Sequence, residues 1–217
     1  MKKYSFIFLI ILSVFLSSCT AINEFFAESE VRDAKKISYY APVVYQRPYE
    51  ETGNTALVQT FENGKQNGPF EVHYPDGKLQ IKGSYKDDKK DGVWEYYRED
   101  GTLEGKVTYK NDEANGKYVA YFENGKTLYS DGTYINGKKN GIEKEYYMSG
   151  KLQSATTYKN DIPEETTMYY PSGKVYMKRN YNKTYEITYY YENGQIFLSG
   201  YVKNNSAYSE WKYYDKK

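Results

Sequence analysis

A short motif recurs along most of this chain at a nearly constant spacing. Six turn signals end in glycine and are followed by Lys, Thr or Gln, and their glycines are 24, 24, 25, 23 and 21 residues apart. These glycines are Gly77, Gly101, Gly125, Gly150, Gly173 and Gly194. A tyrosine follows each of them, at Tyr85, Tyr109, Tyr134, Tyr158, Tyr181 and Tyr201. Self-similarity at a fixed period predicts a repeat architecture.

Each repeat has the pattern of a β-hairpin. Asp-Gly and Asn-Gly pairs between alternating runs favour type I′ turns, which need positive φ at both central residues. The run after the first turn alternates, with Leu79, Ile81, Gly83 and Tyr85 on one side and polar residues on the other. We therefore expect each repeat to contain a strand, a tight turn at the glycine, a second strand and a looser polar turn.

The composition indicates how such repeats could be stabilised. The chain has 29 tyrosines among 217 residues but few Leu, Ile and Val, so aromatic rings must form its apolar face. A single repeat buries too little surface to fold alone, and stacked repeats share their apolar faces. The tyrosines that close the second strands, from Tyr85 to Tyr201, are expected to form this shared core. The predicted fold class is all-β: an elongated antiparallel meander or solenoid of repeated β-hairpins, after a short N-terminal signal and tether.

Several segments carry a resemblance to a known family. Segments 61–68 (FENGKQNG) and 134–141 (YINGKKNG) resemble the Tyr-x-x-Gly-Lys-x-x-Gly signature of MORN repeats, and segments 85–92 and 109–116 match it with the first Gly replaced. The longer period is similar to that of bacterial MORN-variant repeats, whose proteins are often labelled antitoxins of the YwqK type. The resemblance covers about residues 61–214. It implies a long, gently curved sheet, contacts with proteins or lipids, and no catalytic residues.

The N-terminus indicates export and lipid attachment. Met1–Lys3 is positively charged, and the apolar run 6–15 is too short to span a bilayer, as in a signal peptide. Leu16 and the small residues Ser17 and Ser18 precede Cys19, an arrangement that resembles the bacterial lipobox. We expect residues 1–18 to be a lipoprotein signal peptide. Cys19, the only cysteine, would then carry lipid such as palmitate and anchor the chain to a membrane.

The remaining chain divides into a tether and a repeat domain. Residues 19–48 are expected to hold the lipidated cysteine and the tether, in which 22–37 forms either a short amphipathic helix near the membrane or a flexible spacer. Residues 49–217 are expected to form about six repeats with partial ends. Because Thr20 is not the Asp that usually signals inner-membrane retention, we expect a place in the cell envelope at the outer membrane or cell surface.

The sequence contains little that suggests catalysis. His73 is the only histidine, and no metal-ligand cluster or phosphate-binding loop is present, so we expect no enzyme activity, no metal and no cofactor. Without residues 1–18 the chain has 30 − 2 = 28 basic and 29 acidic residues, which argues against nucleic acid as a partner. A hydrolase using paired acids is the less favoured alternative to solvated turn residues. The pairs are Asp87-Asp88, Asp112-Glu113 and Glu164-Glu165.

Tyrosine doublets suggest where a partner binds. Neighbours on a strand point to opposite faces, so one member of each doublet should lie opposite the core. We predict a binding face formed by Tyr97, Tyr121, Tyr146, Tyr169 and Tyr190. Alternatively, Lys side-chain stems half cover that face.

An exposed row of aromatic rings favours binding, because tyrosine is enriched where proteins recognise one another. The sequence therefore predicts a membrane-anchored, non-catalytic scaffold for an unidentified protein partner. The family label adds the role of an antitoxin-like neutraliser in the envelope. The alternative is a lipoprotein that binds cell-wall glycan or peptidoglycan.

Overall fold

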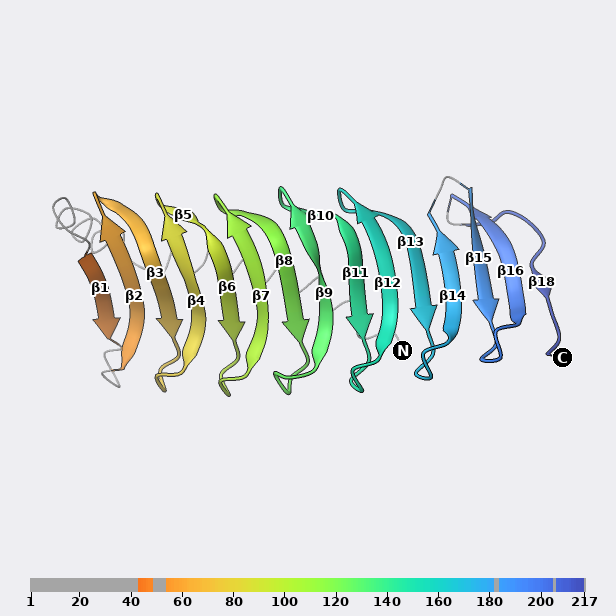
Figure 1. Cartoon of the computed structure of the whole chain (residues 1–217), viewed down its shortest axis with the longest axis horizontal. Coiled ribbons are helices and arrows are strands. Elements are labelled where there is room, and N and C mark those ends of the chain that lie inside the picture. Colours follow the sequence, from red (N-terminus) through yellow and green to blue (C-terminus); the bar gives the residue numbers. More distant parts are fainter. Residues whose placement is uncertain (1–42, 49–53, 182–183, 205, 217) are drawn as a thin grey trace.

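The computed structural model describes residues 43–48, 54–181, 184–204 and 206–216. These residues form one antiparallel sheet of 18 strands, in which the strands follow one another along a single long ribbon (Figure 1). The described chain has no helix, and so none that is long and apolar enough to cross a membrane. The all-β meander of hairpins predicted from the sequence is confirmed.

The strands are β1 (Val43–Pro48), β2 (Thr55–Glu62), β3 (Lys65–His73), β4 (Leu79–Lys86), β5 (Lys89–Lys90), β6 (Gly92–Tyr97), β7 (Leu103–Lys110), β8 (Glu113–Tyr121), β9 (Leu128–Ile135), β10 (Lys138–Lys139), β11 (Gly141–Tyr146), β12 (Leu152–Lys159), β13 (Ile162–Tyr169), β14 (Val175–Asn180), β15 (Thr184–Tyr190), β16 (Ile196–Lys203), β17 (Ser206–Ala207) and β18 (Lys212–Tyr213). The signal peptide, Cys19 and most of the expected tether lie outside the described residues. The last part of the tether range forms β1, which pairs with β2 along its length.

The glycine turns have a different geometry from the one predicted. All six glycines have positive φ, but Asp76, which precedes Gly77, does not. The Gly77 N–H donates to the Tyr74 carbonyl at 2.8 Å, and the Tyr74 N–H donates to the Lys78 carbonyl at 2.8 Å. This is a type I turn followed by a left-handed glycine, the usual three-residue hairpin loop. The prediction of type I′ turns at these glycines was therefore wrong.

Two-residue turns with positive φ at both positions occur instead at the opposite ends of the hairpins, which were expected to be looser. Asp87 and Asp88 have φ of 52° and 67°, and Asn111 and Asp112 have φ of 53° and 71°. Asp and Asn adopt this left-handed conformation more readily than other non-glycine residues. Glu165 does not lie in such a turn, because it belongs to β13.

The aspartates of these turns connect neighbouring repeats. The Asp88 carboxylate accepts a hydrogen bond from the Gln66 N–H at 2.8 Å, and the Asp112 carboxylate accepts one from the Lys90 N–H at 2.7 Å. The Asp161 carboxylate does the same for the Lys139 N–H at 2.7 Å. The turn carboxylates, interpreted from the sequence as merely solvated, therefore join one repeat to the next.

Replacing Asp112 by alanine should destabilise the protein by about 1–2 kcal/mol, because the change removes a charge-assisted hydrogen bond and leaves a non-glycine residue without polar groups at positive φ. Asp112→Asn retains an acceptor oxygen and tolerates this φ, so it should cost much less. Urea unfolding of both variants provides the measurement. Equal losses for the two would contradict a role for the acceptor.

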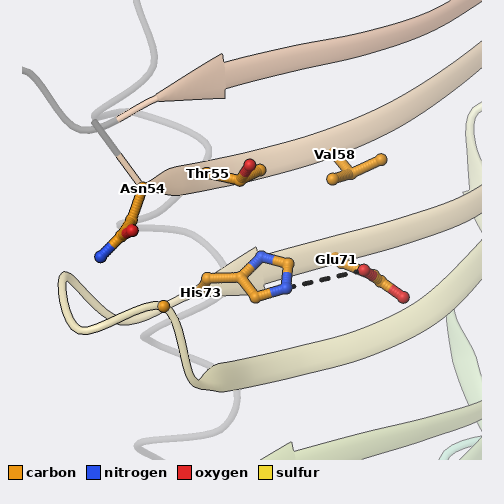
Figure 2. Close-up of a pocket in the computed structure, with 6 residues that line it drawn as sticks. Asn54, Thr55, Val58, Glu71 and His73 are labelled. Atoms are coloured by element: carbon orange, nitrogen blue, oxygen red, sulfur yellow. Dashed lines mark ion pairs between the residues drawn. The ribbon is translucent and has the colours of Figure 1, made fainter. Parts of the chain in front are cut away.

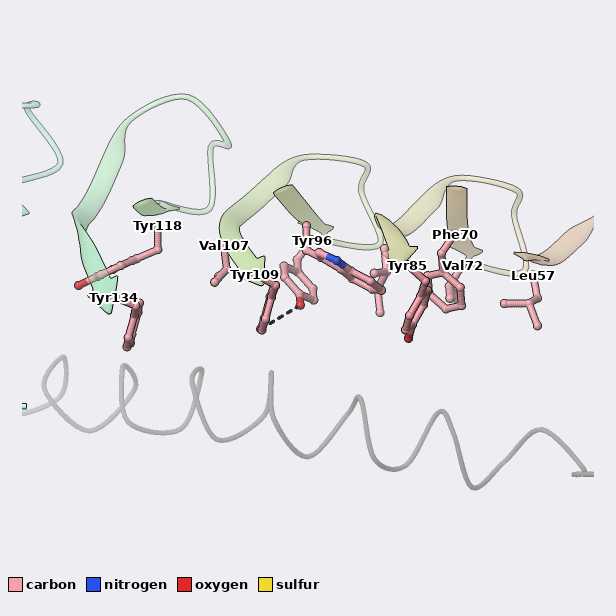
Figure 3. Close-up of a cluster of buried hydrophobic side chains, with 11 residues drawn as sticks. Leu57, Phe70, Val72, Tyr85, Tyr96, Val107, Tyr109, Tyr118 and Tyr134 are labelled. Carbon is pink, nitrogen blue, oxygen red and sulfur yellow. Dashed lines mark hydrogen bonds between the residues drawn. The ribbon is translucent and has the colours of Figure 1, made fainter. Parts of the chain in front are cut away.

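Aromatic rings form the core on one face of the sheet (Figure 3). Trp94 is 1% exposed, and its ring lies 5.4 Å from that of Phe70 and 5.1 Å from that of Tyr85, centroid to centroid. Seven of the eleven residues in this cluster are aromatic, as expected for a chain with few aliphatic side chains. The cluster comprises Leu57, Phe70, Val72, Ile81, Tyr85, Trp94, Tyr96, Val107, Tyr109, Tyr118 and Tyr134.

The same face is more polar in the C-terminal repeats. Glu143, Ser154 and Thr166 are buried there, and the apolar cluster does not extend past Tyr134. Tyr201 was expected in the core but is 47% exposed. Because its neighbour Val202 pairs with the buried Tyr185, Val202 takes the core position and Tyr201 points to the other face. The prediction of a shared core from Tyr85 to Tyr201 therefore holds for Tyr85, Tyr109 and Tyr134, whereas Tyr158 and Tyr181 are only half-buried and Tyr201 lies on the other face.

Candidate binding face

The five tyrosines proposed from the sequence all lie on the face opposite the core, which we call the tyrosine face. The face comprises Tyr97, Tyr121, Tyr146, Tyr169 and Tyr190, all half-buried. Each of them directly follows a register shift at the same place in its hairpin. The residue before each of these tyrosines points to the core face. Tyr96, for example, is 3% exposed, whereas Tyr97 beside it is half-buried on the tyrosine face.

His73 occupies the equivalent position in the first repeat. It follows the register shift between β3 and β4, as the tyrosines do in the later repeats. Its Nε2 lies 3.6 Å from a carboxylate oxygen of Glu71 (Figure 2). These two side chains line a hollow of about 410 Å³, together with Asn54, Thr55, Val58 and Gly77. The only histidine is therefore the first member of the row on the tyrosine face.

Carboxylates hold two of the tyrosine rings along the sheet. The Tyr97 hydroxyl donates to the Glu95 carboxylate at 2.8 Å, and the Tyr146 hydroxyl donates to the Asp131 carboxylate at 2.7 Å. Glu95 also accepts from the Lys106 ammonium at 2.5 Å. A ring tied to a surface neighbour in this way keeps a fixed orientation, so binding would cost little side-chain entropy.

These contacts change the acidity of the groups involved. Burial, followed by the hydrogen bond to Glu95, raises the pKa of Tyr97 to about 12. Burial and the hydrogen bond to Asp131 raise the pKa of Tyr146 to about 12. The Lys106 hydrogen bond holds the pKa of Glu95 below its usual value. At neutral pH the tyrosines are therefore neutral donors and Glu95 is ionised.

Ionisation of tyrosines on the tyrosine face should make the protein less stable in strong alkali. A tyrosine with a raised folded-state pKa stabilises the fold below its unfolded pKa of about 10, and this contribution is lost as the pH rises through the folded value. We therefore expect the free energy of unfolding to fall between pH 10 and pH 12. Urea unfolding across this range should show a shallower fall for the Tyr97→Phe, Tyr146→Phe double variant. If the free energy of unfolding falls as steeply with pH in the double variant as in the unchanged protein, the raised pKa values of Tyr97 and Tyr146 are contradicted.

The other members of the doublets have a structural role that the sequence did not reveal. The Tyr147 hydroxyl donates to the Tyr169 carbonyl in the next repeat at 2.6 Å, and the Tyr170 hydroxyl donates to the Tyr190 carbonyl at 2.8 Å. Tyr74 makes the same bond to the Tyr97 carbonyl at 2.9 Å. An aromatic residue recurring just before the glycine turns was the available signal. These bonds tie the backbone of three tyrosines of the face, Tyr97, Tyr169 and Tyr190, to the preceding repeat.

The ionic pattern of the tyrosine face changes along its length. In the first repeats acids and lysines pair across strands: Lys82 lies 3.6 Å from Glu71, and Lys106 lies 2.5 Å from Glu95. A second hollow, of about 310 Å³, lies over β13, β14 and β15 and has Lys178 in its lining.

Among the described residues, no group of three or more His, Cys, Asp or Glu side chains could hold a metal ion. The described features are those of a shallow contact surface.

An open sheet of equivalent hairpins with one such surface defines a repeat protein of the binding type. The model of the MORN repeat variant family matches the chain four times, at residues 66–87, 90–111, 139–160 and 165–183. The chain is therefore a MORN-variant repeat protein, as its sequence motifs suggested.

Other comparisons add little. No curated protein matches the chain. Among solved structures, it is similar to a chain in the crystal structure of TcdB2-TccC3-Cdc42, with 11% identity and a TM-score of 0.25 over 75% of this chain. The match spans only 11% of that chain and is too weak to inform fold or function.

Proposed function

We propose that this protein is a lipid-anchored, non-catalytic scaffold of the cell envelope that binds a protein partner on its tyrosine face. The observation that carries the proposal is the alignment of five tyrosines, one per repeat, on the face that the core does not use. Tyrosine is enriched at protein recognition surfaces, and neighbouring carboxylates hold two of these five rings in place. The lipid on Cys19 would keep this surface at a membrane, and neutralising an envelope toxin is one task that such a scaffold could perform.

Affinity capture from envelope extract tests the proposed partner. The full chain, purified from membranes in detergent, should retain a stoichiometric protein, and Tyr97→Ala with Tyr146→Ala should abolish the capture. Tyr213→Ala is the matched control, since this side chain is 79% exposed and lies outside the row. Capture that is equally weakened by Tyr213→Ala, or that survives the double change, would contradict the proposed face.

Replacement of Cys19 by alanine tests the anchor. The variant should move from the membrane fraction to the soluble fraction and lack the mass of the acyl chains, because lipidation would be the anchoring contribution. A variant that remains in the membrane fraction would exclude this cysteine as the anchor.

The spacing of the tyrosines favours cell-wall glycan as a second candidate. Successive members lie on every second long strand, and neighbouring strands are about 4.8 Å apart, so the rings recur roughly every 9–10 Å. This is close to the length of one disaccharide in an extended β-1,4-linked polysaccharide, and sugar rings stack on aromatic side chains. Co-sedimentation with purified cell wall, lost on Tyr97→Ala with Tyr146→Ala, would transfer the function to glycan binding.

A further inference from the structure

The hollow over β13–β15 differs from the first repeats because no acidic residue stands directly opposite its lysine on either neighbouring strand. Lys178 pairs across strands with Thr167 on β13 and Thr188 on β15. The equivalent lysines of the first repeats, Lys82 and Lys106, have glutamates within ion-pair distance. In the described chain, no carboxylate lies within the 4.0 Å ion-pair limit of Lys178.

The groups around Lys178 can recognise one carboxylate. Thr167 and Thr188 stand directly opposite Lys178 on the two neighbouring strands, and both line the hollow together with Tyr190. The hydroxyls can donate hydrogen bonds to a carboxylate oxygen while the ammonium supplies the charge, a strong combination where the groups are partly dehydrated. Thr188 is only 8% exposed, so part of this donor set is already withdrawn from water.

The other side of the hollow excludes a polyanion. Glu165 and Glu186 line it together with Asn180, whereas Arg179, which also lines it, donates to the Tyr185 hydroxyl at 2.7 Å. A polymer with closely spaced phosphates or carboxylates would bring negative charge against these two glutamates, at a cost in free energy. A single acidic side chain between uncharged neighbours would meet Lys178 without this repulsion.

We propose that this hollow binds one Asp or Glu side chain of the protein partner, with Lys178 as its counter-ion and Tyr190 packed beside it. The inference rests on the proposed scaffold function and names the chemistry that selects the partner. It places charge recognition in the fifth and sixth repeats, whereas the glutamate-paired lysines of the first repeats contribute no free charge.

Selection of peptides on the intact protein tests this proposal. A displayed library of random peptides is panned on the full chain. One selected peptide that loses binding on Tyr169→Ala with Tyr190→Ala is then measured by fluorescence anisotropy. We expect selected peptides to share one acidic position, and changing that acid to its amide should weaken binding at least about tenfold. Lys178→Gln should weaken binding equally, and the two changes together should cost no more than either alone. Lys126→Gln is the matched control and should have little effect, because this lysine is exposed in the turn after Gly125 and lies outside the tyrosine face.

The outcomes separate this inference from the proposed function. Peptides that lose binding on Tyr169→Ala with Tyr190→Ala but show no dependence on an acid or on Lys178 would refute the carboxylate site and leave the scaffold function standing. Absence of any peptide dependent on the tyrosine face would count against both. Polygalacturonate that binds through Lys178 more tightly than the peptides would replace the protein segment by an anionic polysaccharide. Thermal unfolding of Lys178→Gln confirms that this exposed change leaves the fold intact.

Discussion

Replacing Trp94 by alanine should destabilise the protein by about 3–5 kcal/mol, the cost of removing a large buried aromatic side chain. The indole is 1% exposed and contacts the rings of Phe70 and Tyr85, so the change would leave a cavity between three strands. Gly83 lies directly beneath it, where an added Cβ would come within 2.3 Å of the indole. Because Gly83 has no side chain that could move into the space, the cavity would stay largely unfilled. Urea unfolding monitored by circular dichroism gives the measurement.

Trp211 provides a matched control for this prediction. It lies over Gly200 as Trp94 lies over Gly83, and an added Cβ there would come within 2.6 Å of its ring. Trp211 is half-buried, so Trp211→Ala should cost clearly less than Trp94→Ala. Equal losses would mean that the aromatic cluster does not set the stability.

The second large effect is expected at Glu143, which is 6% exposed in the polar part of the core face. Its carboxylate accepts hydrogen bonds from the Tyr118 hydroxyl and, at 2.6 Å, from the Lys139 ammonium. Glu143→Ala would leave a largely buried ammonium without its counter-ion, at a cost of about 3–5 kcal/mol. Chemical denaturation at neutral pH measures the loss.

Removing both charges separates the ion pair from the packing around it. Lys139→Met combined with Glu143→Leu retains side-chain volume without leaving a buried charge, so it should be less destabilising than Glu143→Ala alone. A double variant as unstable as the single one would show that the hydrogen bond from Tyr118 carries most of the contribution.

The repeat period and the strand alternation could be predicted because both follow from local chemistry. Ile81 and Gly83 lie on the buried face as their spacing indicated, and the turn glycines have the positive φ that glycine permits. The turn types were exchanged because an Asp-Gly pair fits two kinds of hairpin loop, which differ in length and in the conformation of the residue before the glycine. Asp87-Asp88 contains no glycine and so did not indicate a tight hairpin turn, although aspartate tolerates positive φ.

The candidate face could be located from the sequence only in part. The tyrosine doublets identified which residues point away from the core, but not that Tyr147 would bond to the carbonyl of a residue 22 positions later. That threonines and not acids stand opposite Lys178 depends on the register of two other strands. Such cross-strand relations require the register, which a single period does not fix. Tyr201 shows the same limit, since a shift of one residue sends a side chain to the other face.

The bonds between repeats have a consequence for how this molecule can change over generations. The aspartate turns and the tyrosine hydroxyls that join repeats bond only to the adjacent unit, as Asp112 does to Lys90 and Tyr170 does to Tyr190. A duplicated unit inserted in phase would find the same acceptors on both sides, and a deleted one would leave its neighbours able to join. The number of repeats can therefore change by whole units while the hydrogen bonds between neighbouring repeats stay the same. The number of tyrosines presented to a partner would then be set by gene duplication, and affinity could be adjusted by counting units.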